Sequence, residues 1–159
     1  MQGRIACCNV LSDLFSMGVT DIDTVLMVLA VSNKMNAQQK EIVTSLMIQG
    51  FDECAQQVGA YVLGGQTIIN PWPIIGGVGI SVVEREEFLM PNNAKVGDMI
   101  ILTKPLGTQL AVNLKQWYTK DIKDKLEKIQ GFISKEQVDQ AFLKAEMEMG
   151  TLSILPSFQ

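Results

Sequence analysis

Tyr61–Gly79 reads YVLGGQTIINPWPIIGGVG, in which two apolar, strand-like segments flank a predicted glycine turn. The residues of this turn are Gly64, Gly65, Gln66 and Thr67. Paired glycines at the end of a strand let the backbone approach a ligand closely, because no Cβ intervenes. A turn of exposed N–H groups can then cradle an anion, with the Gln66 amide and the Thr67 hydroxyl as further polar partners. The alternative is a glycine turn that only reverses the chain.

Strand-like and helical segments alternate on either side of this stretch. The predicted strands are a continuous apolar run suited to a strand covered on both faces, Thr24–Ser32, and the shorter segments Tyr61–Leu63, Ile74–Val83 and Asp98–Thr103. The predicted helices are Arg4–Met17, a long helix from an Asn36 cap through Val58, Thr108–Tyr118, and a helix from the capping-box sequence at Ser134 to about Met149. Lys120–Lys128 is a charged segment, and exposure of one face to solvent is enough to explain its charges. Because the helices are too few to cover both faces of a long parallel sheet, we expect an α+β fold, a mixed sheet with helices packed on it.

Length and composition indicate a single globular domain. The chain has 159 residues, of which 47% are hydrophobic and 19% charged, so it can bury a core and does not resemble a disordered chain or a coiled coil. No apolar run reaches the roughly 18 residues that cross a bilayer, and the N-terminus lacks a secretory pattern, so we expect no membrane partner and a cytoplasmic location. The net charge of −4, without a lysine-rich block, argues against nucleic acid as a partner. A nucleotide bound with magnesium stays possible, because the metal supplies positive charge locally.

The chain contains no histidine and three cysteines, and both facts restrict its chemistry. Without histidine there is no Ser-His-Asp or Cys-His nucleophile and no His-ligated metal, so any chemistry rests on carboxylates, lysines, backbone amides or a metal. Cys7, Cys8 and Cys54 form no CxxC pair, which argues against zinc. We expect them to be buried thiols in a reducing compartment.

A polar stripe on the first predicted helix is the other candidate site. At about 100° per residue, Asn9, Ser12, Asp13 and Ser16 share one side of an otherwise apolar helix. One interpretation is that the Asp13 carboxylate binds Mg²⁺ with Asn9 beside it as a ligand or water holder, and the other is an ordinary solvent-facing stripe.

Two further residues have open interpretations. Lys104 could contact phosphate or be a solvated lysine at a strand end, and Trp72, between Pro71 and Pro73, could stack on a base or serve in packing or an interface.

Three segments in order resemble the selenophosphate synthetases (selenide, water dikinases) of the eukaryotic type. They are the helix GRIACCNVLSDLFSMG at 3–18, the run GGQTIINPWPIIGG at 64–77, and the strand-to-helix junction LTKPLGTQL at 102–110. The segments SNKM at 32–35 and MPNNAKVGD, which leads to the third segment, match as well. The resemblance runs from about residue 2 to about residue 149.

This resemblance implies a fold, a reaction and site residues. The fold would be the N-terminal domain of the aminoimidazole ribonucleotide synthetase-like superfamily, whose sheets form a barrel across a dimer interface. The reaction would convert ATP, selenide and water to selenophosphate, AMP and phosphate, with Mg²⁺ required. Asp13 matches a magnesium-binding aspartate of the family, and Gly64, Gly65, Gln66 and Thr67 match an ATP-binding run, contributed across the dimer.

The chain also departs from the family pattern. The family's reactive cysteine or selenocysteine loop, with its lysine and another metal-binding aspartate, lies upstream of the helix that opens this chain, and a C-terminal domain lies downstream. We therefore expect a chain truncated at both ends, with a partial ATP-binding domain at 1–118, a connecting segment at 119–149 and a divergent tail at 150–159. We expect no catalytic residue in it, weak binding of Mg²⁺–ATP and no activity by itself. It would act as a homodimer or as a heterodimer with a full-length family member; the alternatives are a non-catalytic dimerisation partner and a paralogue that no longer makes selenophosphate.

Overall fold

A computed structural model of the protein describes residues 1–154. The chain forms two compact units, one of Met1–Thr103 with the described residues from Leu152 on, and one of Lys104–Thr151. The helix that ends near residue 118, the predicted domain boundary, packs against the helix after Ser134 within the second unit. Leu152, at the start of the predicted tail, is buried in the core of the first unit.

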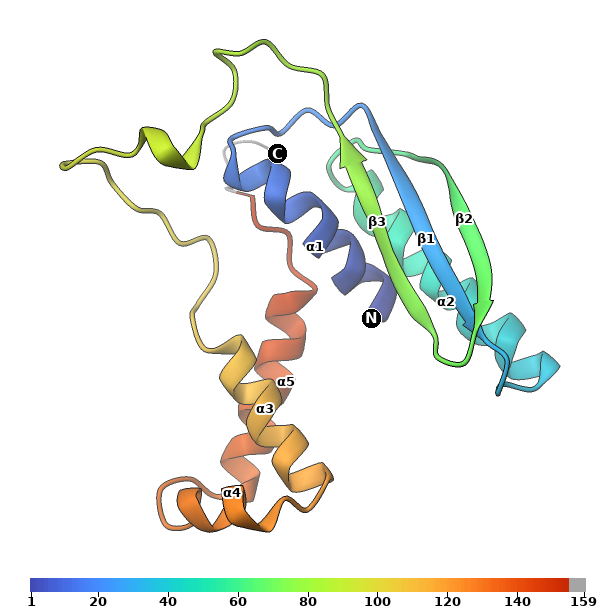
Figure 1. The fold of residues 1–159 in the computed structure, drawn as a ribbon, viewed down its shortest axis with the longest axis vertical. Coiled ribbons are helices and arrows are strands. Elements are labelled where there is room, and N and C mark those ends of the chain that lie inside the picture. The colour runs from blue at the N-terminus through green and yellow to red at the C-terminus, as the bar shows by residue number, and fades with distance from the viewer. Residues whose placement is uncertain (155–159) are drawn as a thin grey trace. The chain divides into compact units, whose positions relative to one another are not determined.

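Two helices of the first unit run side by side. α1 spans Gln2–Ser16 and α2 spans Ala37–Gln56 (Figure 1). The predicted cap of α2 is confirmed, because the Asn36 side chain accepts the Gln39 N–H at 2.8 Å and the Gln39 side chain accepts the Asn36 N–H at 3.0 Å. A Cβ at Gly3 would collide with the Met47 carbonyl, so the two helices approach backbone to backbone at this point.

The strands form one mixed sheet, as expected for an α+β fold. β1 (Thr24–Ser32) is central, β2 (Val62–Asn70) pairs with it in parallel and β3 (Ile74–Ile80) pairs with it antiparallel. The parallel pair needs a crossover connection, which α2 supplies. The link from β2 to β3 passes the end of β1, where the Ser32 hydroxyl donates to the Pro71 carbonyl at 2.8 Å.

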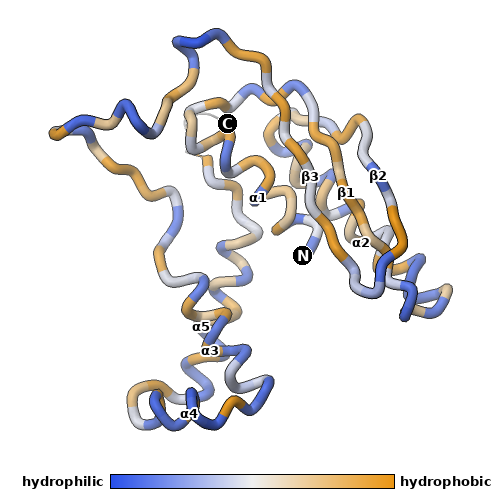
Figure 2. Tube along the Cα trace, viewed as in Figure 1, coloured by the Kyte–Doolittle hydropathy of each residue, from blue (hydrophilic) through white to orange (hydrophobic). Residues whose placement is uncertain are grey.

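Within the described residues of the first unit, helices cover only one face of this sheet. A Cβ at Gly77 would approach Phe51 and Val10, and one at Gly79 would approach Leu14, so this face of β3 lies directly against α1 and α2. The opposite face carries apolar side chains that stay accessible, and Figure 2 shows how apolar residues recur along the strands. The prediction that β1 is covered on both faces is therefore wrong for the described residues of the first unit.

The glycine turn predicted at 64–67 is also wrong as local structure. All four residues lie inside β2, and their partners in the ladder are Leu26, Met27, Val28 and Leu29. The chain turns later, at Pro71-Trp72-Pro73, where the proline rings end the strand. Gly65 does have a φ of +142°, but it adopts this conformation within the paired part of β2, two residues after the register irregularity at Leu63.

The core of the first unit lies between the sheet and the two helices. It is built by buried residues of α1, α2 and β1, of the segments that follow α1 and α2, and of the segment after Met149. These residues are Ala6, Cys7, Cys8, Leu11, Val19, Ile22, Val25, Phe51, Cys54, Ala55, Ala60 and Leu152. The prediction that all three cysteines are buried is confirmed.

The described segment 81–103, which follows β3 in the first unit, contains no strand, although one was predicted at Asp98–Thr103. A 3₁₀ turn at Pro91–Asn93 is its only helical element, and β3 ends at Ile80 and not at Val83. Met99 and Ile100 are more than four-fifths exposed. A strand forms only where a neighbouring strand accepts its hydrogen bonds, and none of the described strands lies beside this segment.

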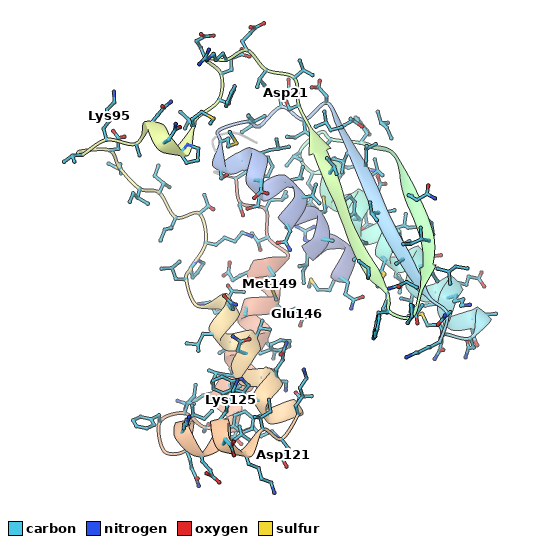
Figure 3. All side chains as sticks on the ribbon, in the orientation of Figure 1. Asp21, Lys95, Asp121, Lys125, Glu146 and Met149 are labelled. Atoms are coloured by element: carbon cyan, nitrogen blue, oxygen red, sulfur yellow. The ribbon has the colours of Figure 1, made fainter. Side chains whose placement is uncertain are left out.

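The second unit is helical. It contains α3 (Thr108–Thr119), α4 (Lys123–Ile129) and α5 (Lys135–Met149). The capping box at Ser134 is confirmed, and hydrogen bonds from the Glu136 backbone N–H and from Ser134 lower the pKa of the exposed Glu136 carboxyl. The Lys115 ammonium lies 2.7 Å from the Asp139 carboxylate and joins α3 to α5. The charged segment predicted to be merely solvated includes α4, whose Lys125 lies 4.9 Å from the Trp117 ring centroid (Figure 3).

Among residues 1–154, no helix combines the length and the apolar character needed to cross a membrane.

Candidate functional site

An open groove of about 430 Å³ lies between α1 and β3 in the first unit. α1 contributes Asn9 and Asp13, together with three apolar residues, and β3 contributes Ile75–Gly79, a stretch that includes three glycines. The floor of the groove is thus apolar and peptide-like, and its polar side chains come from a single helix. Because the two polar residues are four positions apart, they lie one turn apart on the same side of α1.

The Asp13 carboxylate is directed into a solvent-accessible space. Asp13 and Asn9 are both exposed, and neither side chain has a hydrogen-bond or ion-pair partner among residues 1–154. The hydrogen bond that Asp13 does receive is on its backbone: the Ser16 hydroxyl donates to the Asp13 carbonyl oxygen at 2.8 Å. Asp13 is therefore a carboxylate without a structural partner in this unit, which is compatible both with a metal ligand and with an ordinary solvent-facing stripe.

Glycines in β3 form the opposite wall of this groove. A Cβ at Gly79 would lie 2.8 Å from the Leu14 side chain, so only glycine lets α1 lie this close to the strand. Gly77 is restricted in the same way by the Leu26 carbonyl. These glycines set the distance between Asp13 and the sheet. Sequence reasoning did not assign them to the site, although their spacing in IIGGVGI is a signal of close backbone approach within a strand.

The donor set of the groove suits a hard cation only in part. Carboxylate and amide oxygens are what Mg²⁺ prefers, and Asp13 and Asn9 supply them. However, the described residues contain no cluster of three acidic, histidine or cysteine side chains that could hold a metal. Mg²⁺ commonly uses one or two carboxylates together with phosphate oxygens and water. The groove therefore fits a magnesium ion that arrives with a phosphate ligand, and it does not fit a closed metal cage.

The predicted ATP-binding run lies elsewhere on the sheet. Gly64–Thr67 are exposed and lie in β2, which is an edge strand of the described sheet. Half of the N–H groups of an edge strand point away from its neighbour and are free to bind a ligand. Gly65 also has a structural reason to be glycine, because a Cβ there would collide with Met27, whereas a Cβ at Gly64 would make only an ordinary contact with Leu26, at 3.4 Å.

The structure does not bring these two candidate sites together within one chain. The strand order is β2-β1-β3, so the run at 64–67 lies on one edge of the sheet and the Asp13 groove borders the other. If both bind one nucleotide, the parts must come from different protomers or from residues outside this chain.

The two remaining candidates, Lys104 and Trp72, lie in different parts of the chain. Lys104 opens the second unit, just before Gly107, whose φ of +107° precedes α3. Trp72 is two-thirds exposed at the β2–β3 link, and the Lys34 ammonium lies 5.8 Å from its ring centroid. An exposed tryptophan held between two prolines is suited to an interface.

Comparison with known proteins places this geometry in a family. Residues 1–83 match the profile of the AIR synthase related protein, N-terminal domain. These residues contain α1, the complete sheet and both candidate sites. The chain therefore belongs to the AIR synthase-related family, as the α+β fold with its mixed sheet leads one to expect.

Within this family, the chain is similar to proteins named selenide, water dikinase. It is 52% identical over 153 residues to selenide, water dikinase 3 of Danio rerio, 50% identical to selenide, water dikinase 2 of Homo sapiens, and 49% identical over 152 residues to the selenide, water dikinase of Dictyostelium discoideum. Each match covers 96% of this chain and 34%, 34% and 41% of the respective relative. The chain thus spans between a third and two-fifths of the length of these relatives.

Proposed function

We propose that this chain is part of a selenophosphate synthetase, which uses ATP, selenide and water to make selenophosphate, AMP and phosphate. The observation that carries the proposal is continuous similarity, up to 52% identity over 96% of the chain, to proteins named for this activity. The Asp13 groove supports it, because an unpartnered carboxylate beside an amide suits magnesium that is bound with phosphate. The buried thiols fit a reducing compartment, and we propose the cytoplasm.

In this proposal the two candidate sites hold different parts of Mg²⁺–ATP. Asp13 contributes one carboxylate to the metal, and Asn9 orients a water molecule beside it. Gly64–Thr67 lie along the nucleotide, with free N–H groups of β2 and the Thr67 hydroxyl as donors to phosphate oxygens. Mg²⁺ would neutralise part of the phosphate charge. With one carboxylate in the described groove, binding by this chain alone is weak, and selenide-dependent AMP formation is absent.

The open face of the sheet supports dimerisation. Val28, Ile68, Ile74 and Val78 point to this face by their register in the ladders, and their exposed fractions are 42%, 47%, 52% and 52%. A contiguous apolar sheet face of this kind is normally covered by a partner. We propose that a second copy, or a full-length member of the family, packs on it and brings the 64–67 run of one protomer to the Asp13 groove of the other.

Mixed variants test both the site and its shared character. Two versions of the full-length enzyme that contains this chain are prepared, one with Asp13→Asn and one with Gln66→Ala and Thr67→Ala. Each alone should lose selenide-dependent AMP formation. If the site is shared between protomers, co-expressed mixed dimers regain up to half of the wild-type rate, because one of the two sites in each mixed dimer is intact. Activity without selenide dependence would contradict the assigned reaction, and no regain in isolated mixed dimers would contradict the shared site.

A second candidate function, a non-catalytic dimerisation partner, is favoured by the same apolar face. In that case this chain binds a full-length family member through the sheet and changes its activity. Size-exclusion chromatography after co-expression tests this directly. A mixed species that elutes apart from both homodimers is the expected result, and the absence of any mixed species excludes the partner role. Robust AMP formation by the 159-residue chain alone would contradict the proposal that it is inactive.

A further inference from the structure

The three cysteines meet at the contact between α1 and α2, where the proposed function gives them no task. Cys7, Cys8 and Cys54 have exposed fractions of 0%, 1% and 0%. All are reduced thiols, and the Cys8 and Cys54 sulfurs lie 3.6 Å apart. These two residues are 46 positions apart in sequence and belong to different helices.

From this contact we propose that Cys8 and Cys54 are a disulfide-forming pair, whose oxidation by a low-molecular-weight disulfide cross-links α1 to α2.

The helices already hold the two sulfurs in place. Gly3 lies against the Met47 carbonyl, and Gly50 lies against the start of α1, so backbone contact fixes the helix pair one to two turns away from the cysteines. A disulfide has an S–S distance of about 2.05 Å, so the sulfurs must approach by about 1.5 Å, and rotation about the Cα–Cβ bonds moves them without moving a helix. The cross-link would hold α1, and Asp13 with it, against α2.

Cys7 is the competing partner for Cys54. A hydrogen bond with Cys7 is the largest cause that raises the pKa of the Cys54 thiol to about 11; Cys8 opposes this and burial adds to it. Cys7 and Cys8 themselves are neighbours in a helix and are badly placed to bridge each other. The short sulfur contact selects Cys8, and the experiment must distinguish it from Cys7.

The chemistry balances with glutathione disulfide as the oxidant. Because both thiols are buried, reaction proceeds when α1 and α2 open locally. One protein thiolate attacks glutathione disulfide, forms a mixed disulfide and releases one glutathione thiolate. The second protein thiolate then attacks the protein sulfur of the mixed disulfide and releases the second glutathione. Two protein thiols are oxidised, one glutathione disulfide is reduced to two glutathione molecules, and two protons leave the protein thiols.

The test is a redox equilibrium of the whole chain. Protein is incubated anaerobically with graded ratios of glutathione and glutathione disulfide, in urea below the unfolding transition so that the helices can open. Incubations start from reduced and from oxidised protein, and agreement between them shows equilibrium. After acid quenching and alkylation, mass spectrometry counts remaining thiols, and peptide mapping without reductant identifies the bridge.

The expected product is a bridge between Cys8 and Cys54, with the Cys7 peptide alkylated. Cys8→Ala and Cys54→Ala each abolish the bridge, and the matched variant Cys7→Ala keeps it. The oxidised wild type also unfolds at a higher urea concentration than the reduced form, because the bridge closes a long loop in the unfolded chain. A bridge from Cys7 to Cys54, mixed disulfides with glutathione alone, or reduced thiols at the most oxidising ratio would each overturn the proposal. None of these measurements requires nucleotide binding, so they are independent of the proposed function.

Discussion

Gly65 pairs with Met27 in the parallel ladder at a φ of +142°, and a Cβ on Gly65 would collide with the Met27 backbone. Its neighbour Gly64 lacks this restriction, because a Cβ there meets only the Leu26 side chain at an ordinary distance. The two adjacent glycines of the candidate nucleotide run therefore have different structural demands, and substitution can separate structure from binding.

Gly65→Ala should lower the free energy of unfolding by about 3 kcal/mol, since it combines a left-handed backbone with a steric clash. Gly64→Ala is the matched control and should change it by less than about 0.5 kcal/mol. Urea unfolding followed by circular dichroism measures both. Equal destabilisation by the two variants would show that the strand geometry around Met27 differs from that described here.

The cap of α2 should be a measurable part of the stability of the first unit. Asn36→Ala removes the acceptor for the Gln39 N–H and should cost about 1 kcal/mol. Asn36→Asp replaces the amide oxygen with a carboxylate acceptor at the helix N-terminus and should retain the wild-type stability. Chemical denaturation of the three proteins gives the comparison, and similar losses in both variants would mean that the side-chain cap is not what matters.

The buried Cys54 thiol should make stability depend on pH in the alkaline range. The ordinary pKa of a cysteine thiol is 9.0, and the pKa of Cys54 in the folded protein is about 11, so folding favours the protonated form. The resulting stabilisation is fully present below pH 9 and is lost as pH rises from 9 to 11, because the unfolded chain releases the proton first. Thermal melts across this range, under reducing conditions, should fall more steeply for the wild type than for Cys54→Ala. Parallel curves would rule out this contribution.

The open sheet face should carry the contact between protomers. Val78→Lys places a charge on this face without disturbing the core, since Val78 is half exposed on an edge strand. It should weaken self-association by at least about tenfold. Ile42→Lys, at a similarly exposed apolar position on α2, serves as the control and should leave association unchanged. Sedimentation velocity distinguishes the outcomes, and dimers that survive Val78→Lys but not Ile42→Lys would move the interface to the helices.

Local signals in the sequence predicted much of the fold. The caps at Asn36 and Ser134 located two helices, because side-chain and backbone groups there satisfy each other over three residues. The apolar run 24–32 located the central strand. The predictions failed where the answer depended on distant partners. The run 99–102 is as apolar as a strand but has no neighbouring strand in the described chain, and the 64–67 run is a strand because β1 pairs with it.

In the candidate site, too, local sequence signals predicted one part, and contacts between distant segments determine the rest. The helical period alone placed Asn9 and Asp13 on one side of α1, and the structure confirms that both line the groove. The other wall, at Gly77 and Gly79, follows from packing between α1 and β3, which are 60 residues or so apart in sequence. No local pattern specifies that contact. The assignment of Asp13 to magnesium and of 64–67 to ATP came from the resemblance to selenophosphate synthetases, and both remain predictions.

The most direct test of the account is magnesium-dependent ATP binding through Asp13. Equilibrium dialysis of labelled ATP, with and without Mg²⁺, compares the wild type, Asp13→Asn and the control Asp21→Asn, which alters an exposed aspartate of the α1–β1 connection outside the groove (Figure 3). The account predicts weak binding that requires Mg²⁺, a loss of at least about tenfold in Asp13→Asn, and wild-type binding in Asp21→Asn. Equal magnesium-dependent binding by all three proteins would contradict the role of Asp13 and, with it, the proposed site.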